Sequence, residues 1–179
     1  MGERPILITG FSAFLDVSDN PSGALANAVD GRVVQGVPIV GRILPVSYAR
    51  APELTSRWVT ELDARAVVGM GVACGRSSVM VERSGGRRCA DAADVDGVVL
   101  DDLGEGPDRR EATLDAQALA TALGATVSDD AGGYVCNAWL YRVVGRVVVP
   151  AVFIHVPPSG LEPLRLLHAL GVLVEDGVI

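Results

Sequence analysis

The sequence contains no lysine, and this absence excludes one class of mechanism. All 15 basic residues are arginines, so neither a Schiff base nor a lysine nucleophile is available. The 22 acidic residues outnumber the arginines and give a formal net charge of −7. Because binding to a phosphate backbone depends on clustered positive charge, we expect no nucleic-acid partner.

Long hydrophobic runs are also missing. No uninterrupted apolar stretch reaches the roughly 18 residues that a membrane-spanning helix requires, so no membrane partner is expected. Residues 1–5 (MGERP) lead into a short strand-like run, whereas a secretory leader has a charged segment followed by an apolar one. We therefore expect a cytoplasmic protein.

Cysteine and histidine are scarce. Cys74, Cys89 and Cys136 are odd in number and unevenly spaced, which argues against a disulfide framework and against a four-thiolate zinc site. We expect no metal site. His155 and His168 are the only histidines, so the choice of acid–base catalyst is narrow.

The length of 179 residues, of which 49% are hydrophobic, predicts one domain over residues 1–179. Strands are expected over residues 6–11, 66–71, 78–83, 125–128 and 147–156, with one or two more within 33–46. Helices are expected from residue 21 to 29, from 52 to 62, and over 111–123, 134–144 and 161–174. This alternation predicts an α/β fold, a three-layer α/β/α sandwich with a mostly parallel, twisted sheet.

Two further features of this pattern can be compared with a structure. Leu54, Trp58 and Leu62 fall on one side of the helix that begins at residue 52, and we expect this side to be buried. Residues 84–108 are rich in Gly, Asp and Arg and show no periodicity. A loop of this length inside a domain is usually functional or mobile.

Cys136 follows Gly132 and Gly133 and lies in the first turn of the helix predicted over 134–144. The positive end of the helix dipole favours the thiolate there, and the unpaired N–H groups of the first turn can serve as an oxyanion hole. A buried cysteine that packs as a small apolar side chain is the alternative interpretation.

His155 ends the apolar strand predicted over residues 147–156, immediately before two prolines. Ligand crevices of open α/β sheets form at strand ends, so His155 is a candidate catalyst. A histidine that is simply satisfied within the core is the alternative. His168 is expected on the polar side of a surface helix.

Glu82 lies in the strand predicted over residues 78–83, with apolar neighbours. An unpaired buried carboxylate is costly, so water, an arginine or an imidazole has to meet it. The alternative is an acid on an edge strand that faces solvent. Together, Cys136, His155 and Glu82 supply a nucleophile, a base and an orienting acid, although their spacing alone does not establish a triad.

Four blocks of the sequence occur in an order that is specific to one family. They are TGFSAF at 9–14 with NPS at 20–22, GVACGR at 71–76 with VER at 81–83, SDDAGGYVCN at 128–137, and FIHVP at 153–157. In this order they resemble the motifs of the pyrrolidone-carboxylate peptidases (pyroglutamyl peptidase I), which are cysteine peptidases. The resemblance covers residues 6–158.

The resemblance implies a phosphorylase/hydrolase-like fold and an omega-type cysteine exopeptidase. It assigns Cys136 as nucleophile, His155 as base and Glu82 as the acid that orients the imidazole. The implied reaction removes an N-terminal pyroglutamyl (5-oxoproline) residue from a peptide substrate, and it needs neither a metal nor a cofactor.

The resemblance also implies a substrate site. Phe11 and Phe14 sandwich the lactam ring, and Val72, Tyr134 and Val135 line the same site. A flat, uncharged five-membered amide stacks well on aromatic rings and needs no counter-ion. The family has a glutamine where this chain has Val72, which cannot hydrogen-bond the lactam. Another acyl or amide substrate, or a binding protein without catalysis, therefore remains an alternative.

Other departures concern the irregular segment and the end of the chain. The family stretch DARIPDNxG corresponds to DAADVDG at residues 91–97, and the family's oxyanion arginine has no aligned counterpart. Arg87 or Arg88 is the candidate to replace it. The C-terminal helix of the family packs subunits together, and its shortening here leaves a homo-oligomer as an open expectation.

Overall fold

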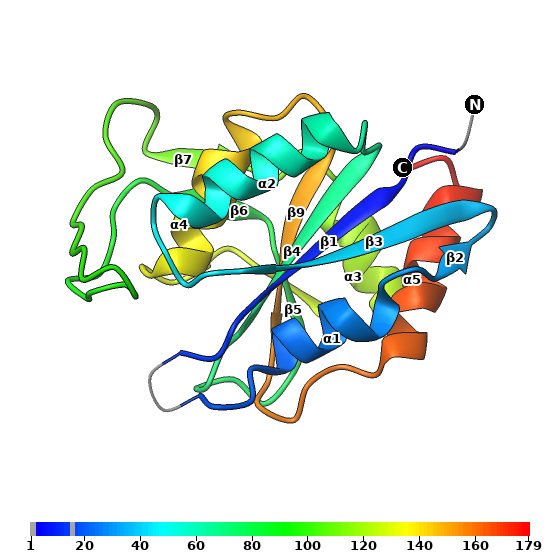
Figure 1. Cartoon of the computed structure of the whole chain (residues 1–179), viewed down its shortest axis with the longest axis horizontal. Coiled ribbons are helices and arrows are strands. Elements are labelled where there is room, and N and C mark those ends of the chain that lie inside the picture. The colour runs from blue at the N-terminus through cyan, green and yellow to red at the C-terminus, as the bar shows by residue number, and fades with distance from the viewer. Residues whose placement is uncertain (1–2, 15–16) are drawn as a thin grey trace.

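A central mixed sheet between two layers of helices forms the computed structural model, which describes residues 3–14 and 17–179 (Figure 1). The seven strands lie in the order β2 (Val33–Val34), β3 (Val37–Leu44), β1 (Ile6–Phe11), β4 (Ala66–Val72), β9 (Ala151–Val156), β5 (Met80–Glu82) and β8 (Thr126–Ser128). Strands β3, β1, β4 and β9 are mutually parallel. Strand β5 runs antiparallel to β9 and parallel to β8, while β2 is antiparallel to β3. The predicted α/β sandwich with a mostly parallel sheet is confirmed.

The helices divide between the two faces of the sheet. One face is covered by α1 (Pro21–Val29), α3 (Ala116–Leu123) and α5 (Pro163–Glu175), and the other by α2 (Arg50–Glu61) and α4 (Val135–Val144). A small second sheet pairs β6 (Ser84–Gly86) with β7 (Arg109–Glu111). The candidate nucleophile therefore lies on the α2/α4 face.

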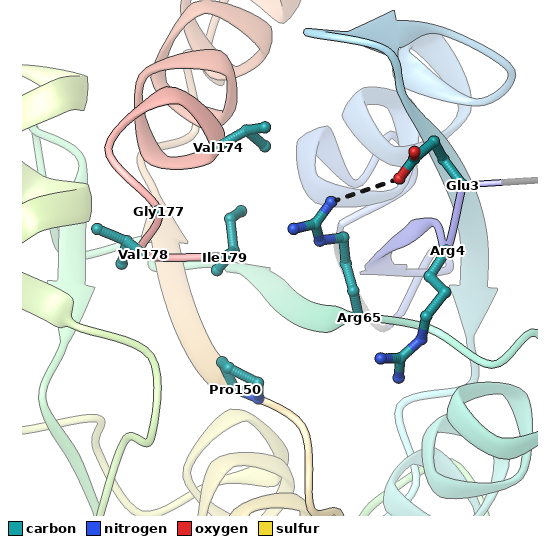
Figure 2. Close-up of a pocket in the computed structure, with 8 residues that line it drawn as sticks. All are labelled: Glu3, Arg4, Arg65, Pro150, Val174, Gly177, Val178 and Ile179. Atoms are coloured by element: carbon teal, nitrogen blue, oxygen red, sulfur yellow. Dashed lines mark ion pairs between the residues drawn. The ribbon is translucent and has the colours of Figure 1, made fainter.

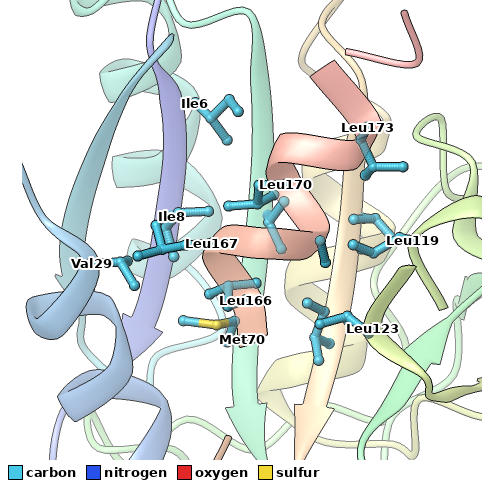
Figure 3. Packing of buried hydrophobic residues seen from close by; sticks show 14 of the residues in the cluster. Ile6, Ile8, Val29, Met70, Leu119, Leu123, Leu166, Leu167, Leu170 and Leu173 are labelled. Carbon is cyan, nitrogen blue, oxygen red and sulfur yellow. The ribbon is translucent and has the colours of Figure 1, made fainter. Parts of the chain in front are cut away.

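Side-chain alternation along the strands supplies both cores. Ile6 and Ile8 of β1 pack against α1 and α5, whereas Leu7 belongs to the cluster under α2 and α4. Figure 3 shows the first of these cores, where Leu166 and Leu170 of α5 lie over the strands. Burying each such side chain stabilises the folded state by about 1.5–3 kcal/mol, so the hydrophobic effect holds both helix layers against the sheet.

A pocket of about 520 Å³ opens at the end of the sheet where the parallel strands begin (Figure 2). It is lined by Glu3, Arg4, Arg65, Pro150, Val174, Gly177, Val178 and Ile179. Arg65 directly precedes β4 and Pro150 directly precedes β9. Because His155 lies near the other end of β9, this pocket is at the opposite end of the sheet from the candidate catalytic residues.

Most predicted elements are present, including the start of α1. Asn20 caps this helix by accepting a hydrogen bond from the Ser22 N–H at 3.1 Å, and Pro21 is its first residue. The helix predicted over 134–144 is present as α4, which is buried almost all round, as expected. His168 is exposed on α5, also as expected.

Two predicted boundaries were wrong. The helix predicted from residue 111 begins at Ala116, because Asp115 caps it by accepting from two N–H groups and residues 109–111 pair with β6 instead. The strand predicted from residue 147 begins at Ala151. Pro150 has no N–H to donate to a ladder and marks the boundary.

The buried side of α2 also differs from the prediction. Leu54, Trp58 and Leu62 are only half-buried, whereas Ala51, Thr55 and Val59 are buried. These smaller side chains allow α4 to approach closely, and the Trp139 indole N–H of α4 donates to Thr55 Oγ1 at 2.9 Å. The helix is therefore turned by about one residue from the expected orientation.

Residues 87–108 form an irregular arm that projects from the α4 side of the molecule in Figure 1. Isolated bridges join Arg88 to Asp102 and Ala93 to Val99, and fold the arm back on itself. The long irregular segment was expected. In the described part of the chain no helix is both long and apolar enough to cross a membrane.

Candidate active site

The site is built around the end of β9, which lies between β4 and β5. His155 is next to Gly71 in the parallel pair with β4 and next to Met80 in the antiparallel pair with β5. Glu82 is opposite Phe153, two residues before His155. Because side chains alternate across a sheet, Glu82 and His155 project from the same face, the one covered by α4.

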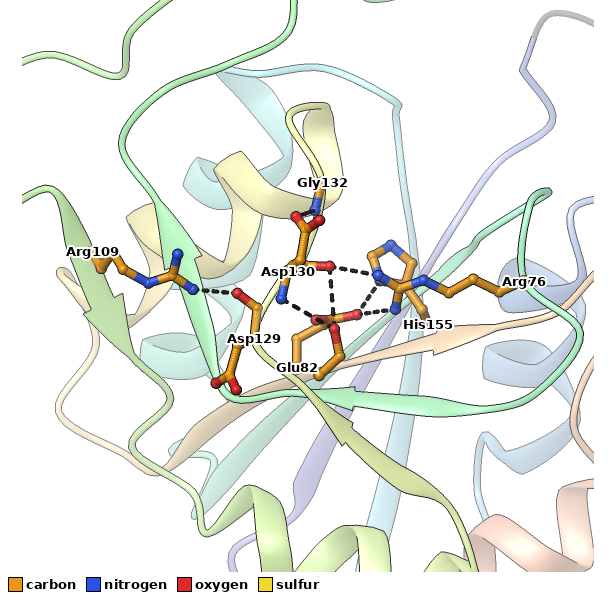
Figure 4. Close-up of polar contacts among 8 residues, drawn as sticks. Arg76, Glu82, Arg109, Asp129, Asp130, Gly132 and His155 are labelled. Atoms are coloured by element: carbon orange, nitrogen blue, oxygen red, sulfur yellow. Dashed lines mark hydrogen bonds and ion pairs between the residues drawn. The ribbon is translucent and has the colours of Figure 1, made fainter.

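Glu82 and His155 are in direct contact (Figure 4). The distance from Glu82 Oε1 to His155 Nδ1 is 2.7 Å, and Glu82 has no exposed surface. The same oxygen accepts a hydrogen bond from the Arg76 guanidinium at 2.5 Å. The buried carboxylate thus meets both an arginine and an imidazole, two of the three partners that the sequence indicated.

Cys136 approaches this pair from the start of α4. It is the second residue of the helix and follows the capping residue Tyr134 by two positions. Its Sγ atom lies over the main chain of Gly71, where a Cβ atom would come within 2.5 Å of the sulfur. Since Gly71 is beside His155 in the sheet, the thiol and the imidazole occupy neighbouring places on one face.

The pKa of His155 reflects these neighbours. Burial alone lowers the pKa of an imidazole, but hydrogen bonds with Cys136 and Glu82 outweigh burial and raise the pKa of His155 to about 9. Nδ1 is occupied by Glu82, so Nε2 is the ring nitrogen that serves Cys136. At neutral pH the ring beside Cys136 therefore carries a proton.

The two glycines before α4 fix how the helix begins. Gly132 has a φ of +76°, a conformation that other residues rarely adopt. Gly133 packs so closely on the arm that a Cβ atom would lie 2.6 Å from the Ala90 nitrogen. The first-turn N–H groups that follow have no partner within the helix, and Cys136 belongs to this turn. They are suited to stabilise an oxyanion.

A pocket of about 210 Å³ opens beside Cys136. Its lining consists of Phe11, Phe14, Val17, Asn20, Val46, Val72, Cys74, Tyr134, Val135 and Cys136. All five residues expected to bind substrate belong to this list, together with the candidate nucleophile. Sequence reasoning did not identify Val17, Asn20, Val46 or Cys74. Asn20 and Cys74 lie in the motifs that carry the resemblance but were given no role in binding, and the valines carry no signal that separates them from core residues.

The polar side chains of the pocket are already engaged. The Asn20 amide accepts from Ser22 and donates to the Ser12 carbonyl at 3.1 Å. The Tyr134 hydroxyl donates to the Ala93 carbonyl at 2.8 Å, and its ring packs 5.4 Å from the Phe14 ring, centroid to centroid. The pocket therefore offers mainly apolar and aromatic surface to a ligand.

The two arginines considered for the oxyanion behave differently. The Arg87 guanidinium is bound by Asp102 and Asp108, each at 3.0 Å, so its charge is already compensated by two carboxylates. Arg88 is exposed, and its carbonyl accepts from the Asn137 amide at 3.3 Å. Asn137 also bonds both main-chain groups of Gly86, so it ties the arm to the start of α4.

Cysteine peptidases use this arrangement, with a thiol at a helix start, an imidazole beside it and a carboxylate behind the imidazole. No group of three or more metal-ligating side chains occurs within residues 3–14 and 17–179. A family model described as pyroglutamyl peptidase matches residues 4–160. The chain belongs to the pyroglutamyl peptidase family, as the sequence motifs predicted.

Individual relatives agree with this assignment. The pyrrolidone-carboxylate peptidase of Halalkalibacterium halodurans is 33% identical over 168 residues, which cover 86% of this chain and 84% of the relative. The enzyme of that name from Chromobacterium violaceum is 30% identical, over 98% of this chain and 88% of its own. Among solved structures, the pyrrolidone carboxyl peptidase from Thermococcus litoralis superposes with a TM-score of 0.84 at 28% identity, covering 96% and 92% of the two chains.

Proposed function

We propose that this protein is a cysteine exopeptidase that removes N-terminal pyroglutamyl residues from peptides. Cys136 is the nucleophile, His155 the general base and acid, and Glu82 the residue that orients His155. The observation that carries the proposal is the 2.7 Å contact between Glu82 and His155, made on the side of the ring away from Cys136. Family membership makes a peptide the substrate class.

The reaction starts with the proton of Cys136 already on His155, because the raised pKa of His155 keeps the imidazole protonated at neutral pH. The thiolate attacks the pyroglutamyl carbonyl carbon and forms an S–C bond, while the carbonyl oxygen becomes an oxyanion near the first-turn N–H groups of α4. The C–N bond then breaks, and the imidazolium gives its proton to the leaving amine. The product at this stage is a thioester on Cys136.

Water completes the cycle. His155 accepts a proton from a water molecule as its oxygen attacks the thioester carbonyl, and the C–S bond breaks. The thiolate is reprotonated by the imidazolium, and free pyroglutamate leaves. Throughout, Phe11 and Phe14 are suited to contact the lactam ring, because both line the pocket beside the sulfur.

The test is hydrolysis of a fluorogenic pyroglutamyl amide under reducing conditions. The wild-type protein is expected to release the fluorophore, and Cys136→Ala is the matched control because it removes only the sulfur. A rate for wild type no higher than that of the control contradicts the proposal. The rate of alkylation of Cys136 by iodoacetamide near neutral pH then distinguishes an active thiol from a non-catalytic binding protein.

A second candidate function keeps the thiol chemistry and changes the acyl group. It is favoured by the apolar character of the pocket. The wall carries Val72, and the polar groups of Asn20 and Tyr134 already make hydrogen bonds within the protein. An apolar pocket discriminates weakly against a ring that lacks polar groups, whereas a hydrogen-bonding pocket rejects it strongly. Comparing cyclopentanecarbonyl and pyroglutamyl amides decides between the two candidates. Faster cleavage of the carbocyclic amide favours the second.

A further inference from the structure

Arg76 contacts two parts of the candidate active site at once. One guanidinium nitrogen is 2.5 Å from Glu82 Oε1, and another is 2.5 Å from the main-chain carbonyl oxygen of Asp130 (Figure 4). Asp130 belongs to the loop that leads into α4, so this single side chain joins the orienting acid to the segment that presents Cys136. The main chain at Arg76 is fixed by a turn, in which the Arg76 N–H donates to the Ala73 carbonyl at 3.0 Å.

The Glu82 carboxylate depends on few partners. Its Oε1 atom accepts from both Arg76 and His155, while Oε2 is buried without a hydrogen-bond partner among the described residues. A carboxylate with no exposed surface is costly to keep charged unless cations compensate it. Arg76 and His155 are the two groups that do so.

These two groups differ in whether they keep their positive charge during the reaction. A guanidinium keeps its proton at all relevant pH values, whereas the His155 imidazolium gives its proton to the leaving amine during the reaction. At that moment Glu82 loses one of its two compensating charges. Only Arg76 then remains as the cation beside the carboxylate that holds the imidazole by Nδ1.

We propose that Arg76 is a positioning residue, which compensates the charge of Glu82 and keeps this carboxylate directed at His155 through the whole reaction cycle. Its second bond, to the Asp130 carbonyl, holds the nucleophile loop in register with that acid. The inference rests on the proposed function, since it assigns Arg76 a part in the same reaction. Arg76 itself does not touch the reacting atoms.

Arg109 provides a control that separates the two contacts. Its guanidinium donates to the Asp129 carbonyl, one residue before Asp130, and to Ser84 Oγ at 2.5 Å. It holds the same loop, and in the part of the chain that the structure describes its guanidinium bonds Ser84 and Asp129 and not Glu82. Replacing either arginine by methionine removes one positive charge and one loop bond, and only the change at Arg76 removes the partner of the carboxylate.

The charged and titratable groups around Glu82 are few. His155 faces it from β9, Arg76 from the β4–β5 connection and Cys136 from α4. At the surface beyond them lie the side chains of Asp129 and Asp130, of which Asp129 pairs with Arg83 at 3.2 Å and Asp130 accepts from the Gly132 N–H at 2.9 Å. Loss of one cation from this group raises the proton affinity of the remainder.

The experiment measures kcat and kcat/KM against pH for wild type, Arg76→Met, Arg76→Lys and Arg109→Met. Arg76→Met is expected to lower kcat roughly tenfold to a hundredfold and to leave KM little changed. Losses of this size follow when a group that holds an active-site residue in place is removed. The acid limb of its kcat/KM profile moves to higher pH by about one pH unit. Arg76→Lys retains the position of the limb, and Arg109→Met does not move it.

Chemical rescue adds a readout that a purely structural role does not give. The Arg76 side chain is 23% exposed, so a small cation can reach the place that Arg76→Ala leaves open. Guanidinium at millimolar concentration is expected to restore part of the kcat of Arg76→Ala and to leave Arg109→Ala unchanged. Equal pH profiles for Arg76→Met and Arg109→Met, or no rescue of Arg76→Ala, overturn the inference.

Alkylation of Cys136 keeps this test separate from the proposed function. Its rate with iodoacetamide, followed against pH by mass spectrometry of the peptide that contains Cys136, needs no substrate. If wild type cleaves no pyroglutamyl amide, the proposed function fails, while an upward shift of the alkylation profile in Arg76→Met still supports the role of Arg76. An unshifted profile contradicts it. Where Arg76→Met is unfolded, as judged by thermal denaturation, Arg76→Gln supplies the decision, because it removes the charge but keeps a hydrogen-bond donor, and it is expected to show the same upward shift of the alkylation profile.

Discussion

A Cβ atom placed on Gly71 would lie only 2.5 Å from Cys136 Sγ, so the thiol occupies the space that a side chain at position 71 would need. Gly71→Ala is therefore expected to displace the sulfur from His155 and to lower kcat/KM by about a hundredfold, because small misplacements of reacting groups are costly. Gly75→Ala is the matched control, since no heavy atom lies within 4 Å of a Cβ atom there. Equal activities of the two variants would contradict the placement of the thiol.

The titration of His155 depends on Cys136. We expect NMR of wild type to show a His155 pKa near 9. Cys136→Ala is expected to lower this pKa, because the contact with Cys136, which raises it together with the contact to Glu82, is lost. The chain has only two histidines, so His168→Gln assigns the resonances. A His155 pKa that is the same in wild type and Cys136→Ala would show that the thiol does not contact the ring.

The stability of the protein is expected to fall as the pH rises from about 6.5 toward 9. His155 has a higher pKa in the folded protein than the 6.5 of a free imidazole, so the folded state binds this proton more tightly than the unfolded chain does. The contribution is complete below pH 6.5, is lost as the pH rises through 9 and amounts to about 3 kcal/mol at most. Urea denaturation at several pH values measures it. His155→Gln should flatten the dependence, and an unchanged slope would contradict this assignment.

Val72 is expected to set the preference for the acyl group. Val72→Gln adds an amide to the wall of an otherwise apolar pocket, and should raise kcat/KM for a pyroglutamyl amide relative to a cyclopentanecarbonyl amide. We expect a change in this ratio of about fivefold or more, since one hydrogen bond is worth about 1 kcal/mol or more. The isosteric change Val72→Thr is the control. A ratio that Val72→Gln leaves unaltered would place the specificity elsewhere in the pocket.

Asp94 is expected to hold one wall of the pocket. Its buried carboxylate accepts from the Tyr48 N–H at 2.8 Å and from two N–H groups of the arm, at residues 96 and 98, each at 2.9 Å. Asp94→Asn should lower the free energy of unfolding by about 1–3 kcal/mol and raise KM more than it lowers kcat, because Tyr134 bonds the neighbouring Ala93. The exposed Asp101→Asn serves as control. Thermal denaturation and steady-state kinetics measure both effects.

The local sequence determined much of what the structure shows around the nucleophile. Two glycines before an apolar run predicted a helix with Cys136 in its first turn, and α4 begins at Val135. The side of α2 that faces the core could not be predicted in the same way. The apolar pattern favoured the larger side chains, whereas close approach of α4 and the bond from Trp139 favoured Thr55.

The role of Arg76 could not be predicted for a different reason. A buried Glu82 indicated that an arginine or an imidazole would meet it, but the chain has 15 arginines and the spacing selects none of them. The choice depends on β5 running antiparallel to β9, which aligns Glu82 with Phe153 and brings Arg76 past the end of the strand. Strand order and direction are long-range properties that local periodicity does not encode.

The central place of β9 in the sheet has a consequence for synthesis. This strand is the last of the chain, yet it lies between β4 and β5, which leave the ribosome much earlier. Until residues 151–156 have emerged, β4 and β5 each present an unpaired edge, and unpaired edges promote association between chains. The same strand carries His155, so the proposed proton transfer also requires that β9 has been inserted between its two neighbours.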